Sequence, residues 1–167
     1  MEANYNQDVT SCILFNKNSN NYNGLKKNPF PSKRRKEVFM RHVIALFGEA
    51  EKGQFSTPYL FQKLPQLVDS LGNPPIESKG LFFAIQALLY EREIIYFRVQ
   101  TEGFSKEDYM IGFKQLQNSE KIKKISALCL PGVGDAEILS AADAPCAIHK
   151  SSLIMTEQDL YDYLTSG

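Results

Sequence analysis

The sequence predicts an α/β fold with a small parallel sheet of about three strands and helices on its faces, preceded by two or three helices and a disordered N-terminal arm. Its 167 residues suit one domain, and 43% of them are hydrophobic, which is enough to bury a core. From residue 94 onward, strand and helix patterns alternate, and right-handed crossovers turn that order into a parallel sheet. We expect one domain over residues 37–167, helical over 37–92 and of β-α-β-α-β-α order over 93–167.

The first 36 residues are expected to form a flexible basic arm. They hold seven Lys or Arg against two acids, whereas the remainder holds 12 basic and 17 acidic residues. Their Asn-, Ser- and Lys-rich composition buries too little apolar surface to offset the cost of ordering. The charge run of the arm supplies the interaction candidates Lys33, Arg34, Arg35 and Lys36. The apolar stretch Cys12–Phe15 could add to a sheet edge, dock on a partner or dock on the chain's own body.

Three helices are expected before the first strand, over residues 37–47, 57–71 and 74–91. In the first helix, apolar residues recur at helical spacing between Glu37 and Gly48. Thr57 offers an N-cap oxygen to the second helix and Pro58 suits its first position, while Pro65 should kink it. The third helix is apolar around nearly its whole circumference, so we expect it to be the most buried one.

Strands are expected over residues 94–99, 125–130 and 147–155. The first of them is β-branched and aromatic with apolar neighbours in succession, as in a central strand covered on both faces. Ser105 with Asp108 resembles a capping box that opens the helix after this strand. A short helix is expected over 135–142, and Thr156 with Asp159 predicts the cap of a last helix.

The loops at the carboxyl ends of these strands are where an open parallel sheet binds ligands. Six residues of these loops are candidate ligand-binding residues: Glu102, Gly132, Gly134, Asp135, Glu157 and Asp159. Gly132 and Gly134 could let backbone N–H groups approach a phosphate, although Asp135 would repel it. The alternative is that these glycines serve only the turn between strand and helix.

The acids of these loops could instead converge on Mg²⁺ and assist a phosphoryl transfer. The stretches Val99–Gly103 and Leu153–Asp159 resemble the toprim pattern of topoisomerases and primases, which carries metal on a Glu-Gly and an Asp-x-Asp. The resemblance implies metal ligands at Glu102 and Asp159, with Glu157 in place of the first Asp. Acids in the first turn of a helix also complement the helix dipole without a metal, so both interpretations stay open.

Two further patterns concern other chemistry. Leu130–Gly134 resembles the hairpin of helix-hairpin-helix DNA-binding modules, but Asp135 stands where those modules continue with basic or small residues. Cys146 and His149 could form a thiolate pair, although Pro145 marks a loop and a buried apolar role for Cys146 is the alternative. The three cysteines lack the C-x-x-C spacing of a zinc site, which indicates reduced thiols in a reducing compartment.

No motif establishes an enzyme. The acidic body, basic arm and aromatic content favour a soluble intracellular protein-interaction module. The alternative is a small α/β ligand-binding or Mg²⁺-dependent phosphoryl-transfer domain that uses the strand-end acids and the Pro131–Gly134 loop. No apolar run reaches the roughly 20 residues of a membrane span, and no secretory signal is recognised, so we expect a cytoplasmic protein, with leaderless secretion left open. The negative body argues against a nucleic-acid partner, and the oligomeric state stays open.

Overall fold

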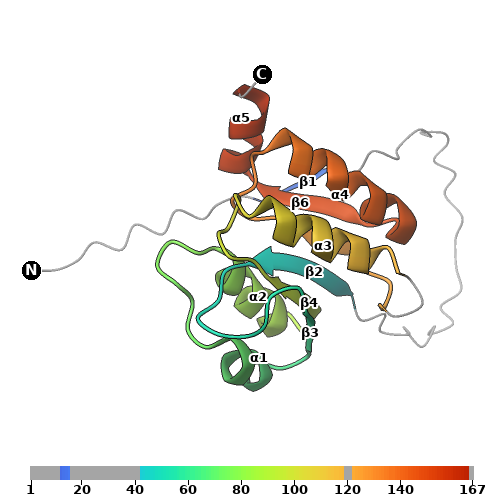
Figure 1. Ribbon diagram of the computed structural model, residues 1–167. Helices are drawn as coiled ribbons and strands as arrows, with labels where there is room; N and C mark the ends of the chain where they lie inside the picture. The colour runs from blue at the N-terminus through green and yellow to red at the C-terminus, as the bar shows by residue number, and fades with distance from the viewer. Residues whose placement is uncertain (1–11, 16–41, 119–121, 166–167) are drawn as a thin grey trace, which may run out of the picture.

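The computed structural model describes residues 12–15, 42–118 and 122–165 (Figure 1). Within these residues the chain forms one six-stranded sheet and five helices. The strands are β1 (Cys12–Phe15), β2 (Val43–Gly48), β3 (Pro58–Phe61), β4 (Glu93–Arg98), β5 (Ala127–Cys129) and β6 (Ser152–Thr156). The helices are α1 (Leu64–Leu71), α2 (Gly80–Leu89), α3 (Lys106–Leu116), α4 (Ala136–His149) and α5 (Glu157–Thr165).

The strands of the sheet lie in the order β1-β6-β5-β2-β4-β3. The inner strands β6, β5, β2 and β4 are parallel, while β1 pairs with β6 and β3 pairs with β4 in antiparallel fashion. The chain passes from β2 to β4 and then reverses to β5, which places the topological switch point between the carboxyl ends of β2 and β5. The predicted α/β class is confirmed, with one more parallel strand and two antiparallel edges.

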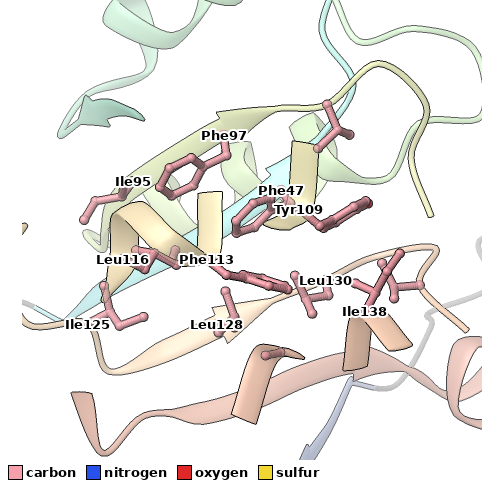
Figure 2. Close-up of a cluster of buried hydrophobic side chains, with 14 of the residues drawn as sticks. Phe47, Ile95, Phe97, Tyr109, Phe113, Leu116, Ile125, Leu128, Leu130 and Ile138 are labelled. Carbon is pink, nitrogen blue, oxygen red and sulfur yellow. The ribbon is translucent and has the colours of Figure 1, made fainter. Parts of the chain in front are cut away.

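Helices cover both faces of the sheet, so the domain has three layers (Figure 1). α3 and α4 pack on one face, and α1 and α2 pack on the other. The first core lies between the sheet and the helices α3 and α4, and the second core lies between the sheet and the helices α1 and α2. In the first core, the ring of Phe47 stacks on those of Phe97 and Tyr109, with centroids 4.6 and 5.3 Å away (Figure 2). Leu46 belongs to the second core. β2 is therefore buried on both faces, which explains its uninterrupted apolar sequence.

The prediction of a helix over residues 37–47 is wrong in the part that the structure describes, because Val43–Gly48 is the central strand β2. A short apolar run fits a buried strand and a buried helical segment equally well. The outcome depends on pairing with β4 along one edge and with β5 along the other. These partners lie far along the chain, so local spacing cannot reveal them. Residues 37–41 lie outside the described part.

The prediction of a helix over residues 57–71 is wrong for the first half of that range. Pro58–Phe61 forms the edge strand β3, and α1 begins at Leu64. Proline is compatible with the first position of an edge strand, because its missing N–H removes no bond from the sheet interior. Pro65 lies in the first turn of α1, where a missing N–H is harmless, so it opens the helix and does not kink it.

Other boundaries also differ from the expectation. α2 begins at Gly80, later than expected, and α4 continues through Pro145 to His149, so the loop expected at Pro145 is wrong and β6 starts later. The expected capping box before α3 is wrong as well. Ser105 and Asp108 instead accept backbone hydrogen bonds from the preceding loop.

Several expectations are confirmed. β4, α3, β5, α4, β6 and α5 follow one another in the predicted order. The apolar stretch Cys12–Phe15 does add to a sheet edge, as β1 beside β6 (Figure 1). The rest of the expected arm, including Lys33–Lys36 and the boundary at residue 36, lies outside the described residues.

Replacing Gly112 of α3 with alanine should destabilise the fold, because an added Cβ would lie 2.6 Å from Cζ of Phe47 in the packed rings of the first core. We expect the free energy of unfolding to fall by about 1–3 kcal/mol, whereas helix propensity alone predicts a gain of about 1 kcal/mol. Urea unfolding measures the difference. The exposed Lys114→Ala on the same helix is the control, and a stabilised Gly112→Ala variant would contradict the packing.

Candidate functional site at the carboxyl edge of the sheet

Glu102, in the loop after β4, places its carboxylate at the N-terminus of α2. Oε1 accepts a hydrogen bond from the backbone N–H of Lys79 at 2.8 Å. Oε2 accepts from the backbone N–H of Gly80 at 3.1 Å and from the hydroxyl of Ser78 at 2.8 Å. The first N–H groups of a helix have no partner within it, and the helix dipole favours a negative charge beside them. The chain's own acid therefore occupies the position at which a helix N-terminus binds an anion.

Glu102 also ties α2 to the end of β2. Its backbone N–H donates to Oε1 of Glu49 at 2.8 Å, and the hydroxyl of Tyr96 donates to the carbonyl of Glu49 at 2.8 Å. Two glycines permit the close approach, since a Cβ on Gly48 would lie 2.7 Å from the Cα of Gly80. The ends of β2 and β4 and the start of α2 are therefore held together.

Asp159 has a similar role beside the loop that follows β5. This buried carboxylate accepts through Oδ2 from the N–H groups of Gly132 at 3.0 Å and Thr156 at 3.1 Å. The Asp159 N–H donates to Oγ1 of Thr156 at 3.2 Å, which confirms the predicted cap of α5. Gly132 also meets the loop after β4, because a Cβ on Gly103 would lie 2.8 Å from the carbonyl carbon of Gly132. The loops after β4 and β5 and the first turn of α5 therefore meet at Gly132.

The remaining candidates of this edge are placed as helix caps, turns and surface groups. Asp135 is the N-cap of α4, and its Oδ1 accepts from the N–H groups two and three residues further on at 2.8 and 2.9 Å. Glu157 is exposed in the first turn of α5. Gly134 packs against α5, where a Cβ would lie 3.0 Å from Cβ of Asp162. Gly132 has φ of 76° and so fits the interpretation as a turn residue, whereas Gly134 is not among the glycines with positive φ.

The strand-end acids do not fit a Mg²⁺ site as they stand. Among the residues that the structure describes, no three His, Cys, Asp or Glu side chains are grouped so that they could hold a metal ion. Glu102 and Asp159, which the toprim-like pattern pairs, both border Gly132, and each already accepts backbone hydrogen bonds. The helix-hairpin-helix resemblance is wrong, since the strand β5 precedes the Leu130–Gly134 loop.

His149 is buried, and the backbone engages both of its ring nitrogens. Nε2 lies 2.6 Å from the carbonyl oxygen of Leu116, and Nδ1 lies 3.3 Å from the amide nitrogen of Ile125. A carbonyl only accepts and an amide N–H only donates, so Nε2 is the donor and Nδ1 the acceptor in this arrangement. Neither ring nitrogen is left to take a proton from Cys146, which argues against a thiolate pair.

A pocket of about 330 Å³ opens away from these loops, between α4, β6 and α5. Its walls are formed by Leu139, Ser140, Asp143, Cys146, Ser151, Leu153, Met155, Leu160 and Tyr163. The strand-end candidates do not line it. Leu139, Asp143 and Cys146 recur at helical spacing, so they line one side of α4. Sequence reasoning misses this pattern, because the helix is expected to end at residue 142.

The hydroxyls of two buried tyrosines, Tyr96 and Tyr109, form hydrogen bonds with the backbone at the carboxyl edge. Burial raises the pKa of Tyr96 well above its usual value, and the charge of Glu102 raises it further. Burial likewise raises the pKa of Tyr109, against the effect of a hydrogen bond that its hydroxyl oxygen accepts from the N–H of Gly103 at 2.9 Å. Both hydroxyls are therefore neutral parts of the edge and not proton acceptors.

Comparison of the chain with protein-family models, with curated proteins and with solved structures gives no match. In the described part of the chain, none of the helices combines the length and the apolar character needed to cross a membrane. The function must therefore be argued from the geometry of the described residues.

Replacing Glu102 with glutamine should destabilise the protein. The substitution removes the negative charge, and it places the NH₂ group of the amide, which only donates, opposite backbone N–H groups that also donate. We expect a loss of about 1–3 kcal/mol in the free energy of unfolding. The control Glu107→Gln changes an exposed acid in the first turn of α3 and should cost less than about 1 kcal/mol. Chemical denaturation compares the two, and equal losses would show that Glu102 acts only through the helix dipole.

The stability of the protein should fall in alkali, with Tyr96 and Tyr109 each contributing. Just above pH 10 these groups ionise only in the unfolded chain, because their folded pKa values are raised. The free energy of unfolding is therefore lost as pH rises, by up to about 1.4 kcal/mol per pH unit for each tyrosine. Tyr96→Phe and Tyr109→Phe should each flatten this slope in urea unfolding series above about pH 10. The exposed Tyr161→Phe should not, and identical slopes in all variants would refute the assignment.

Proposed function

We propose that the protein works by binding another protein, and that it does so through an exposed apolar face of α2. The α2 face consists of the exposed Phe82 and Leu89, which lie seven residues apart and therefore on one side of the helix, bordered by the partly buried Ile85, which packs against the second core. The observation that carries the proposal is exposure: Phe82 is 53% exposed and Leu89 is 64% exposed.

The adjoining side of α2 already forms part of the core. Leu81, Ala84 and Leu88 are buried in the cluster that joins α2 to β2 and β4. A helix that is apolar all round is normally covered all round, but α2 leaves Phe82 and Leu89 exposed on one side. Covering a Phe or Leu side chain stabilises by about 1.5–3 kcal/mol, and contiguous exposed apolar surface marks interaction sites.

The form of the α2 face favours a helix as the partner surface. Phe82 and Leu89 lie about two turns apart along one side of α2, and a ridge of side chains at that spacing packs into the groove between side chains of a second helix. An amphipathic helix with apolar residues at the same spacing is the recognition mode that fits a ridge of this kind.

Protein binding is better supported than ligand chemistry at the strand ends. Glu102, Asp135 and Asp159 each use at least one carboxylate oxygen to accept from backbone N–H groups of this chain. A ligand or metal bound through those oxygens would have to displace these bonds. The α2 face, in contrast, can be covered without any change in the domain.

Site-specific photo-crosslinking tests the proposal. p-Benzoylphenylalanine placed at Phe82, in the cells that make the protein, should yield one defined adduct whose crosslinked peptide in the partner is an amphipathic helix. Leu89→Asp in the same chain should reduce that adduct at least about tenfold, because a charge then replaces a leucine that the partner would cover. Circular dichroism and urea unfolding establish that the Leu89→Asp chain is folded.

The matched control places the same crosslinker at Ile148, which is 49% exposed on α4 across the sheet. This position should not give the adduct. The proposal fails if positions 82 and 148 give the same adducts, if position 82 gives none, or if it links only to a second copy of the chain.

A further inference from the structure

We infer that the pocket between α4, β6 and α5 binds a small, largely apolar molecule that carries one hydroxyl or carbonyl group. This site is independent of the proposed protein-binding function. α2 packs in the second core, whereas the pocket wall of α4 and β6 belongs to the first core, on the other face of the sheet. An occupant of the pocket would therefore not cover the α2 face.

The size and the walls of the pocket suit a molecule with one ring. About 330 Å³ lies at the lower end of the range for small-molecule sites. Leu153 and Met155 alternate along β6 and so share the face of the sheet that α4 covers. Leu139 and Leu160 add apolar walls from α4 and α5. The lining is therefore mainly aliphatic, and Tyr163 of α5 adds an aromatic residue to it.

One polar atom of the lining has no partner within the described structure. The Oγ of Ser151 is buried, and none of the described groups accepts or donates a hydrogen bond to it. A buried hydroxyl without a partner costs about 1–3 kcal/mol, and native structures usually satisfy such groups with water or a ligand. Ser151 lines the pocket, and rotation about its Cα–Cβ bond would turn the buried Oγ toward a bound molecule. Because a serine hydroxyl both donates and accepts, a hydroxyl or a carbonyl oxygen on that molecule would then supply the missing bond.

The polar groups of α4 complete the site. Ser140 and Asp143 lie one turn apart and line the same pocket as Ser151, and Asp143 is exposed to solvent. A site of this kind has an apolar interior and a polar rim, the usual build of a small-molecule site. The chemistry excludes a strongly anionic ligand, which would meet the Asp143 carboxylate and find no cation among the residues of the lining.

Two probes separate the apolar part of the site from its hydrogen bond. 4-Methylphenol carries a hydroxyl on a single ring, and toluene has the same ring without it. Titration of the ¹⁵N-labelled full chain with each probe should give saturable amide shifts in α4, β6 and α5. Ser151→Ala should weaken 4-methylphenol about fivefold and leave toluene unchanged, because one hydrogen bond is lost.

A pair of variants on α5 controls for location. Leu160→Trp fills the pocket from its wall and should abolish the binding of both probes, whereas Leu164→Trp, at a 69% exposed position of the same helix, should leave both unchanged. Urea unfolding of both variants confirms that they are folded. The inference is overturned if neither probe gives saturable shifts, if the shifts lie on α2, or if Ser151→Ala weakens both probes equally. None of these outcomes bears on crosslinking at Phe82, so the two proposals fail separately.

Discussion

The carboxylate of Glu102 is the interaction on which the carboxyl edge of the sheet depends. It accepts from the backbone at the start of α2, 22 and 23 residues earlier in the chain, while its own N–H binds Glu49, 53 residues earlier at the end of β2. A partly buried charge is costly unless donors surround it, so the acid holds α2 in one position. The meeting of Gly48 with Gly80 follows from that position.

The same principle governs the other two helix starts at this edge. Asp135 caps α4 and Asp159 caps α5, and Asp159 also binds the turn after β5 through Gly132. An open parallel sheet usually receives its ligand where these loops meet. Here the chain's own carboxylates fill that position, so they act as internal anions and fix the loops. Apolar surface that is left exposed and a buried hydroxyl that lacks a hydrogen-bond partner within the described structure lie elsewhere, on the α2 face and at Ser151 in the pocket.

The sequence predicts those parts of the fold that depend on local pattern. β4 is recognised because its apolar run is bounded by charged residues and Gly103, and the cap of α5 because Thr156 and Asp159 interact over three residues. β2 is misread, because its identity depends on pairing with strands about 50 and 80 residues further on. The strand-end location of Glu102 is predictable, but its donors are not, because they depend on where α2 begins. The pocket is hidden because α4 continues through Pro145.

The fixed position of α2 also bears on how its exposed face would work. A helix that ordered only on binding would lose conformational entropy at that step, and affinity would fall accordingly. α2 is instead anchored at its N-terminus by Glu102 and along its length by Leu81 and Leu88. Phe82 and Leu89 are therefore presented in one geometry before any partner arrives. An anchored apolar ridge discriminates by shape, since a partner helix must match its spacing to cover both side chains.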